Sequence, residues 1–120
     1  MAGRHRWFVP DGYLPGESSH GVLSHEAACV LNAGGREARL RITFYFEDRD
    51  PEGPVEIVVG ARRTRHVRLD DPEAIGGIAL PHDTPFAYAV ESDEPVVLQH
   101  SRLDTSADAY TLFTTIAYGE

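Results

Sequence analysis

The 120-residue sequence contains no lysine, a single cysteine, a single methionine and a single tryptophan. All 11 basic residues are arginines, and the 19 acidic residues leave a net charge of −8. Non-specific binding to nucleic acid needs a basic surface that releases counterions, so this charge makes nucleic acid an unlikely partner. The lone Cys29 lies in the apolar run 27–31 and cannot form an intramolecular disulfide. We expect a buried thiol in a reducing compartment.

Long hydrophobic runs are also missing. No apolar segment approaches the ~18 residues that span a bilayer. The arginines near the N-terminus are not followed by the apolar stretch of a secretory signal. We therefore expect a cytoplasmic location. The hydrophobic fraction of 42% excludes a wholly disordered chain, and the length predicts one domain over residues 1–120.

Hydrophobic residues recur with period two along most of the chain. The clearest case is Leu40, Ile42, Phe44 and Phe46, which alternate with other side chains as in a half-buried antiparallel strand. The same pattern predicts strands over 6–9, 24–32, 39–46, 55–59, 60–70, 86–92, 96–103 and 110–118. Short strands at this spacing predict an all-β fold, a single antiparallel β-sandwich of about eight strands.

Turn chemistry separates these strands. We expect turns at Pro10-Asp11-Gly12 and at Asp93-Glu94-Pro95, between the strands 86–92 and 96–103. The segment 70–85 is predicted to be a long loop. At most one helical turn starts there at Asp71, because Gly76-Gly77 stops it.

The stretch 60–70 carries more polar chemistry than a strand needs. Alternation places Val67 and Leu69 on one face, and Thr64, His66 and Arg68 on the other, with Arg62 at the start of that row. The row is either a polar floor for a small hydroxylated or anionic ligand, or a solvated sheet face.

Three further stretches place polar groups in or beside apolar strands: Ser24-His25-Glu26, Pro81-His82-Asp83-Thr84 and Gln99 to Asp104. In the last, alternation puts His100 and Arg102 on one face and Gln99 and Ser101 on the other. Burying such groups unpaired costs about 1–3 kcal/mol each, so they pair with one another, face water or meet a partner.

Metal binding and catalysis are both poorly supported. The six histidines show no His-x-His or His-x-x-x-His spacing, and there is no cysteine pair. No Gly-x-Ser-x-Gly motif exists, and Ser24 and His25 point to opposite faces of a strand. We expect no metal, no cofactor and no enzymatic activity; a metal-dependent enzyme is the weakest of three hypotheses. Trp7, Tyr13 and Tyr45 instead offer flat amphipathic surfaces that suit a binding module.

Several long segments together resemble one family. They are Trp7, Gly12-Tyr13-Leu14-Pro15, Leu23-Ser24-His25-Glu26, Leu31-Asn32-Ala33-Gly34, Ala61 to Arg68, Pro81-His82-Asp83-Thr84, Gln99 to Asp104 and Thr115-Ile116-Ala117-Tyr118. In this order, from about Gly3 to Gly119, the sequence resembles the Anabaena sensory rhodopsin transducer family.

The resemblance implies a homotetrameric β-sandwich without enzymatic activity. It implies a module that binds a small polar ligand, a sugar or a small anion, within a sensory pathway. The alternative is a protein-interaction transducer that docks a membrane photoreceptor and has no small-molecule ligand. The ligand-lining residues implied by the matching segments are Trp7, Ser24, His25, Glu26, Asn32, Arg62, Thr64, His66, Arg68, His82, Asp83, Gln99, His100 and Arg102.

Overall fold

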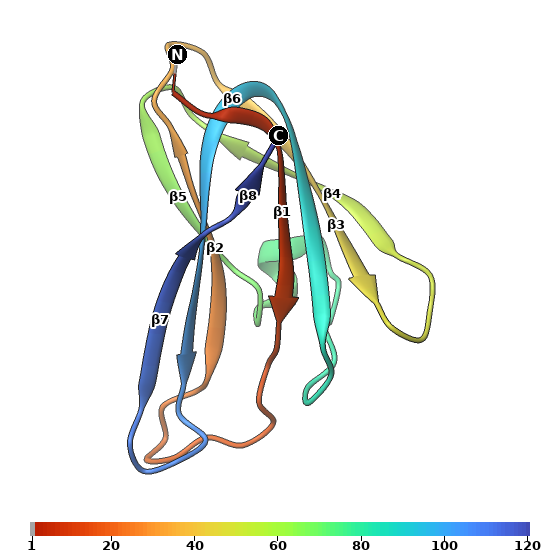
Figure 1. Ribbon diagram of the computed structural model, residues 1–120, viewed down its shortest axis with the longest axis vertical. Coiled ribbons are helices and arrows are strands. Elements are labelled where there is room, and N and C mark those ends of the chain that lie inside the picture. Colours follow the sequence, from red (N-terminus) through yellow and green to blue (C-terminus); the bar gives the residue numbers. More distant parts are fainter. Residues whose placement is uncertain (1) are drawn as a thin grey trace.

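The computed structural model describes residues 2–120, which form eight β-strands and one short 3₁₀ helix (Figure 1). The elements are β1 (Arg4–Gly12), β2 (His25–Asn32), β3 (Ala38–Phe46), β4 (Glu52–Val59), β5 (Arg63–Arg68), η1 (Pro72–Ile75), β6 (Phe86–Asp104), β7 (Thr111–Ile116) and β8 (Tyr118–Gly119). No helix among residues 2–120 is long and apolar enough to cross a membrane.

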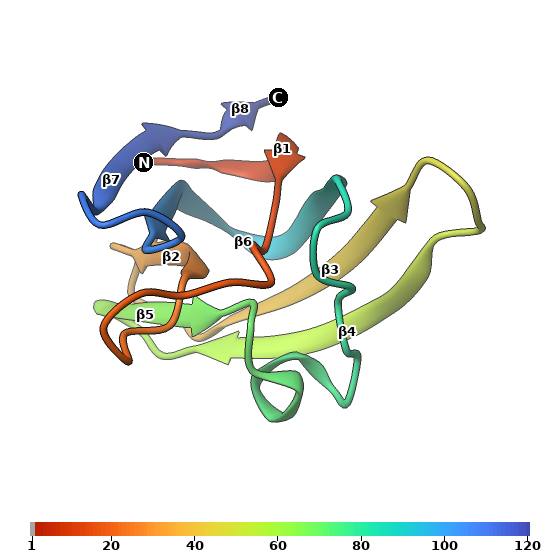
Figure 2. The same cartoon turned by 90° about the horizontal axis from the view of Figure 1, so that it is seen from below.

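The strands form two layers that share β6. Its first half pairs with β1 and β3 in the order β4-β3-β6-β1-β8, and its second half pairs with β2 and β7, with β5 beyond β2. Every pairing is antiparallel. Seen from below, the layer of β5, β2 and β7 lies on one side of the molecule and the layer of β3 and β4 on the other (Figure 2). The predicted all-β sandwich is confirmed.

Alternating residues of the strands fill the space between the layers. Leu40, Ile42 and Phe44 of β3 are completely buried, which confirms the alternation predicted for 39–46. On β5, Val67 and Leu69 are buried while Thr64, His66 and Arg68 are exposed, as the sequence predicted. One apolar core therefore holds both layers together.

The predicted tight turn at Asp93-Glu94-Pro95 is wrong, because β6 is a single 19-residue strand. Arg6 pairs with Glu91 but Arg4 pairs with Val96, so residues 92–95 form a bulge. There β6 bends over the top of the molecule and passes from one layer to the other (Figure 1). Strands that switch sheets commonly do so at such bulges. Trp7 Nε1 donates to the carbonyl oxygen of Val96 at 2.9 Å and so holds the bend against β1.

Two other boundaries differ from expectation. Pro10-Asp11-Gly12 does not end β1; the strand continues to Gly12, and a register shift after Val9 accommodates a proline that has no N–H. The strand predicted over 110–118 is divided at Ala117 into β7, which pairs with β6, and β8, which pairs with β1.

Of the two remaining local predictions, one is confirmed and one is wrong. The single helical turn in the loop 70–85 is confirmed as η1: Asp71 caps it by accepting from the N–H of Glu73, and Gly76, with a φ of 68°, ends it. The predicted buried thiol is wrong: Cys29 is a free thiol but only half-buried, because its side chain lies on the outer face of β2.

Candidate functional site

A chain of three polar side chains crosses the middle of the core. Tyr88 Oη lies 2.7 Å from Nδ1 of His100, and Nε2 of His100 lies 2.5 Å from Oε1 of Glu26. Tyr88, His100 and Glu26 are all almost completely buried. Since Tyr88 is in the first half of β6 and His100 in the second, this chain joins the two layers of the sandwich.

The Glu26 carboxylate is well supplied with donors. Its Oε2 accepts from the backbone N–H of Tyr13 at 2.6 Å, and its Oε1 accepts from Arg102 at 3.3 Å as well as from His100. A buried carboxylate is tolerated only when it is paired in this way. With Nε2 of His100 donating to Glu26, a neutral imidazole accepts at Nδ1 from the Tyr88 hydroxyl. Burial, and then the charge of Glu26, raises the pKa of Tyr88 well above its ordinary value, so Tyr88 keeps this proton.

Arg102 connects this buried chain with the surface. Its guanidinium lies 5.0 Å from the ring centre of Phe113, and its NH2 group lies 3.5 Å from a carboxylate oxygen of Asp11. Its Nε is buried and has no hydrogen-bond partner among residues 2–120. The Arg102 guanidinium is therefore incompletely hydrogen-bonded, and it lies beside Asp11 and Phe113.

Asp11 and Phe113 line a groove between β1 and the β7–β8 segment. The groove has a volume of about 480 Å³ and is lined by Phe8, Val9, Pro10, Asp11, Phe113, Thr115, Ile116, Ala117 and Tyr118. Phe8, Phe113 and Tyr118 are aromatic. The polar side-chain groups of the lining are the Asp11 carboxylate, the Thr115 hydroxyl and the Tyr118 phenol. We call this cavity the β1–β7 groove.

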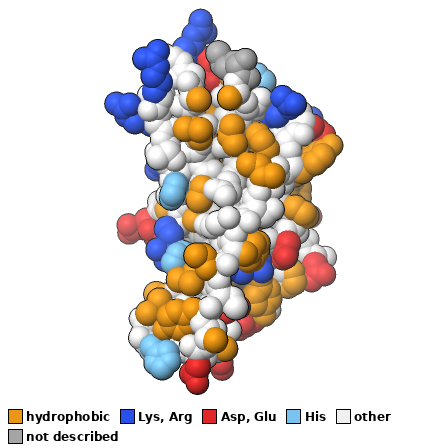
Figure 3. Space-filling view, turned by 60° about the vertical axis from the view of Figure 1, so that its left-hand side comes forward, with side chains coloured by type: hydrophobic (Ala, Val, Ile, Leu, Met, Phe, Trp, Pro, Cys, Tyr) orange, Lys and Arg blue, Asp and Glu red, His pale blue; other side chains and the backbone are white. Residues whose placement is uncertain are grey.

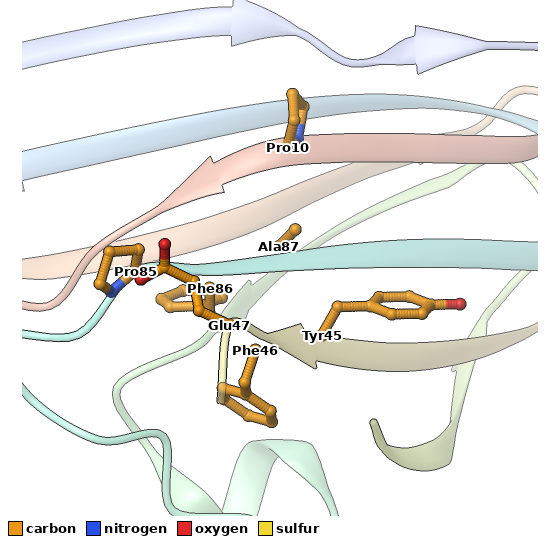
Figure 4. Close-up of a pocket in the computed structure, with 7 residues that line it drawn as sticks. All are labelled: Pro10, Tyr45, Phe46, Glu47, Pro85, Phe86 and Ala87. Atoms are coloured by element: carbon orange, nitrogen blue, oxygen red, sulfur yellow. The ribbon is translucent and has the colours of Figure 1, made fainter. Parts of the chain in front are cut away.

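A second hollow lies on the other layer, between β3 and the start of β6 (Figure 4). It measures about 280 Å³ and is lined by Pro10, Tyr45, Phe46, Glu47, Pro85, Phe86 and Ala87. It is smaller than the β1–β7 groove, and Glu47 is the single charged residue in its lining.

The fourteen ligand-lining residues expected from the sequence do not meet in one cavity. Glu26, His100 and Arg102 come together in the buried chain. Trp7, Ser24 and Asn32 are buried and hydrogen-bonded to the protein itself: Trp7 to Val96, Ser24 to Thr105, and Asn32 to backbone groups of four residues.

Most of the others lie on the outer face of the layer formed by β5, β2, β6 and β7. His66 is opposite Cys29, and Cys29 is opposite Gln99, so these side chains form a row across the strands. The residues of the expected site on this face are His25, Thr64, His66, Arg68 and Gln99. Figure 3 shows this side, where hydrophobic and histidine side chains are mixed and arginines gather near the top. Arg68 is held by both carboxylate oxygens of Asp70, at 2.7 and 2.8 Å.

The last three lie in loops. Asp83 accepts from the N–H of Gly16 at 3.0 Å and from the Tyr13 hydroxyl at 3.4 Å. His82 lies 3.3 Å from the carbonyl oxygen of Pro15, so it belongs to the same loop contact. Arg62 is exposed, with a φ of 53°, in the turn before β5. Among residues 2–120 no group of three His, Cys, Asp or Glu side chains is placed to hold a metal ion.

The sequence did not indicate five residues that matter in the structure: Tyr88, Phe8, Asp11, Phe113 and Tyr118. Tyr88 was hidden in an apolar strand, where its ring packs in the core and only its hydroxyl is polar. For Tyr118 a signal existed, because it ends the family-matching segment Thr115-Ile116-Ala117-Tyr118. The exposure of Phe113 and Tyr118 became evident only in the fold. Asp11 lay in a segment interpreted as a turn.

The family model of the Anabaena sensory rhodopsin transducer matches residues 2–119. The chain belongs to this family. Among solved structures, Thermotoga maritima 1070 is similar to this chain, with 41% sequence identity and a TM-score of 0.89. The matched region covers 100% of this chain and 97% of that one. The Anabaena sensory rhodopsin transducer is similar at 40% identity with a TM-score of 0.70, covering 83% and 97%. No curated protein matches the chain.

Proposed function

We propose that this transducer-family chain is a non-enzymatic module that binds a small polar ligand, a sugar being the first class to test, in the β1–β7 groove. The observation that carries the proposal is the groove itself. Its volume of about 480 Å³ is in the range of small-molecule sites, which combine apolar and aromatic walls with a few polar groups.

The lining of the groove suits an amphipathic molecule. Phe8, Phe113 and Tyr118 offer flat apolar surfaces against which the C–H face of a sugar ring packs. Asp11, whose side chain is 78% exposed, accepts hydrogen bonds from hydroxyls. Arg102 does not line the groove itself, but its guanidinium lies directly behind two lining residues, Phe113 and Asp11. Through Arg102 a bound ligand would contact the buried Glu26–His100–Tyr88 chain, and this is the route by which binding would reach both layers.

A thermal-shift screen of sugars and small acids tests the proposal at one fixed protein concentration. Concentration is fixed because the melting temperature of an associating protein depends on it. A ligand at 100 times its Kd adds about 2.7 kcal/mol, which is a shift of several degrees for a domain of this size.

Phe113→Ala and Tyr45→Ala form a matched pair of variants for any ligand found. The two side chains are aromatic and similarly exposed, 42% and 44%, but Phe113 lines the β1–β7 groove and Tyr45 the hollow of Figure 4. The proposal predicts that the shift disappears in Phe113→Ala and persists in Tyr45→Ala. The reverse pattern, or a screen with no shift for a folded protein, would contradict it.

The second candidate function is docking to a membrane photoreceptor, in line with the name of the Anabaena relative. It is favoured by exposed apolar side chains on the outer face of β2 and β7 and in the segment just before β2, namely Val22, Leu23, Leu31, Leu112 and Ile116. Exposed apolar patches of this kind mark interaction surfaces. Co-sedimentation with vesicles that contain a retinal-binding photoreceptor, compared with empty vesicles, tests this function.

The homotetramer and the cytoplasmic location belong to the proposal as well, on the strength of the family. Sedimentation velocity of the full chain measures the first, and fractionation of cells that express it measures the second.

A further inference from the structure

A furrow runs along the outer face of the layer of β4, β3, β6 and β1, over the first half of β6. Its floor is made of Ala87 and Ala89, which alternate with the core residues of this strand. Tyr45 and Thr43 of β3 are opposite these two alanines, and Phe8 of β1 is opposite Ala89. Because neighbouring strands lie about 4.8 Å apart, the walls on β3 and β1 stand about 10 Å apart over a floor of methyl groups. We call this surface the β3–β1 furrow.

Two hollows make up the β3–β1 furrow, and Tyr45 lines both. In the hollow of Figure 4, of about 280 Å³, Ala87 lies between Pro10 on β1 and Tyr45 on β3. The other hollow measures about 200 Å³, and Thr43 and Glu91 belong to its lining. The four residues from Ala87 to Glu91 extend the floor over about 13 Å. The furrow therefore has the length and width of a short extended chain.

The backbone beneath the furrow decides which kind of chain fits. Over this stretch β6 pairs with β3 on one side and with β1 on the other, so its N–H and C=O groups are used within the sheet. A β-strand laid on the furrow would gain no ladder hydrogen bonds. A polyproline II helix needs none, because its backbone makes no internal hydrogen bonds and proline has no N–H. Such helices dock in grooves lined by aromatic side chains, as Tyr45 and Phe8 line this one.

The wall on β3 also carries hydrogen-bond donors at a suitable spacing. The hydroxyls of Thr43 and Tyr45 belong to one hollow, and the Tyr45 side chain is 44% exposed. Residues two positions apart on a strand are separated by about 7 Å. In a polyproline II helix, carbonyl groups two residues apart are separated by about 6 Å along the axis. The two hydroxyls can therefore donate to two carbonyl groups of one bound helix.

Charge distinguishes the two ends of the furrow. Glu47 lines the hollow of Figure 4 and begins the segment 47–52, in which four acidic residues and one arginine give a net charge of −3. At the other end Glu91 is opposite Arg41 on one side and Arg6 on the other. A basic side chain is therefore attracted to the end of the furrow at Glu47.

We propose that the β3–β1 furrow binds a short proline-rich segment of another protein in the polyproline II conformation, with an arginine or lysine at the end that lies over residues 47–52. This binding function does not depend on the ligand of the β1–β7 groove. The two sites share a wall, because Pro10 lines both cavities. A partner held in the furrow would therefore lie next to the groove.

Fluorescence anisotropy of labelled peptides tests the proposal on the full chain. The probes are two peptides of six prolines that carry two arginines, one at the N-terminal and the other at the C-terminal end, because the furrow accepts a chain in either direction. At least one of the two should bind. A control peptide has glycines in place of the prolines and the same charge. It should bind at least about tenfold more weakly, because it is not pre-organised.

Three variants locate the binding. Tyr45→Ala should raise the Kd of the proline peptide about tenfold or more, and Glu47→Gln should raise it by up to about fivefold. Phe113→Ala is the matched control, since Phe113 is similarly exposed but lines the β1–β7 groove, and it should leave the Kd unchanged.

Four results would overturn the proposal. They are a folded chain that binds neither proline peptide, equal binding of the glycine peptide, and binding that Phe113→Ala removes and Tyr45→Ala does not. The fourth is a sugar whose thermal shift disappears in Tyr45→Ala, which would assign the furrow to another occupant.

Discussion

Nε2 of His100 lies 2.5 Å from Oε1 of Glu26, with both side chains fully buried. The pair is diagonal across the ladder between β2 and β6, because Glu26 is opposite Arg102 and Ala28 is opposite His100. With Tyr88 on the far side of the imidazole, the contact connects β2 to both halves of the bent strand β6. The stability of the sandwich and the position of Arg102 at the β1–β7 groove depend on the same few hydrogen bonds.

His100→Ala should lower the free energy of unfolding by about 3–5 kcal/mol, because it leaves the buried Glu26 carboxylate with one fewer partner. It also leaves the Tyr88 hydroxyl unpaired and creates a cavity. Urea denaturation measures the change. The neighbouring Gln99→Ala, at an exposed position, should change stability by no more than about 0.5 kcal/mol. Equal effects of the two substitutions would show that the buried hydrogen bonds among Glu26, His100 and Tyr88 do not stabilise the fold.

Tyr88→Phe should cost about 1–3 kcal/mol at neutral pH, because Nδ1 of His100 loses its donor. The difference in stability between wild type and Tyr88→Phe also depends on pH. Burial raises the pKa of Tyr88 above its ordinary value of 10.0, so above pH 10 the tyrosine ionises in the unfolded state before it does in the folded state. This contribution to stability is complete below pH 10 and is lost as the pH rises further. The gap between wild type and Tyr88→Phe should therefore narrow above about pH 10, and a constant gap would refute the assignment.

Ser106→Ala should slightly destabilise the turn after β6 at neutral pH but not in acid. The hydroxyl and the N–H of Ser106 both donate to Asp104, at 2.6 and 2.9 Å, and they lower the pKa of this carboxyl below 3.8. A lowered pKa contributes stability above the unfolded value and loses it as the pH falls through the folded value. Because the pair is exposed, the loss should be below about 1 kcal/mol at pH 7 and should shrink as the pH falls below 3.8 and through the lowered pKa of Asp104. Thermal melts of both proteins between pH 2 and 7 measure the difference in stability; a difference that does not shrink toward pH 2 would point to another cause.

The fold was predictable from the sequence wherever one face of a strand is apolar. Leu40, Ile42 and Phe44 show this, since burial and alternation agree at each position. Asp93-Glu94-Pro95 shows the limit: these residues are typical of a turn, but pairing with β1 and β3 on one side and β2 on the other keeps β6 extended through its bend. Pairing with strands that are distant in the sequence overrode the local turn preference, and this pairing cannot be read from residues 93–95 alone.

The candidate site was predictable only in part, for a related reason. The sequence placed His100 and Arg102 on the same face of their strand, and the structure confirms this. It could not show that Glu26, more than seventy positions earlier, lies beside them, because that depends on the register of β2 against β6. The β1–β7 groove forms where β7 leaves one layer and β8 joins the other, a crossing that alternation does not reveal.

Trp7→Phe separates a structural role of this residue from the stacking role suggested by the sequence. Trp7 is 7% exposed and donates its indole N–H to Val96 at the bend of β6. Loss of that bond should cost about 1–2 kcal/mol and leave the binding of a groove ligand unchanged. Urea denaturation and calorimetric titration measure the two effects. Normal stability together with lost binding would assign Trp7 to the ligand instead.

The most direct test of the central claim is the mapping of a bound ligand on ¹H–¹⁵N correlation spectra of the full chain. With the strongest hit of the sugar and small-acid screen, the account predicts the largest amide shifts at Asp11, Phe113 and Ala117, which line the β1–β7 groove. Amides along β5, from Thr64 to Arg68, should stay unchanged. Largest shifts along β5, or around Tyr45 and Ala87 in the hollow of Figure 4, would contradict the account.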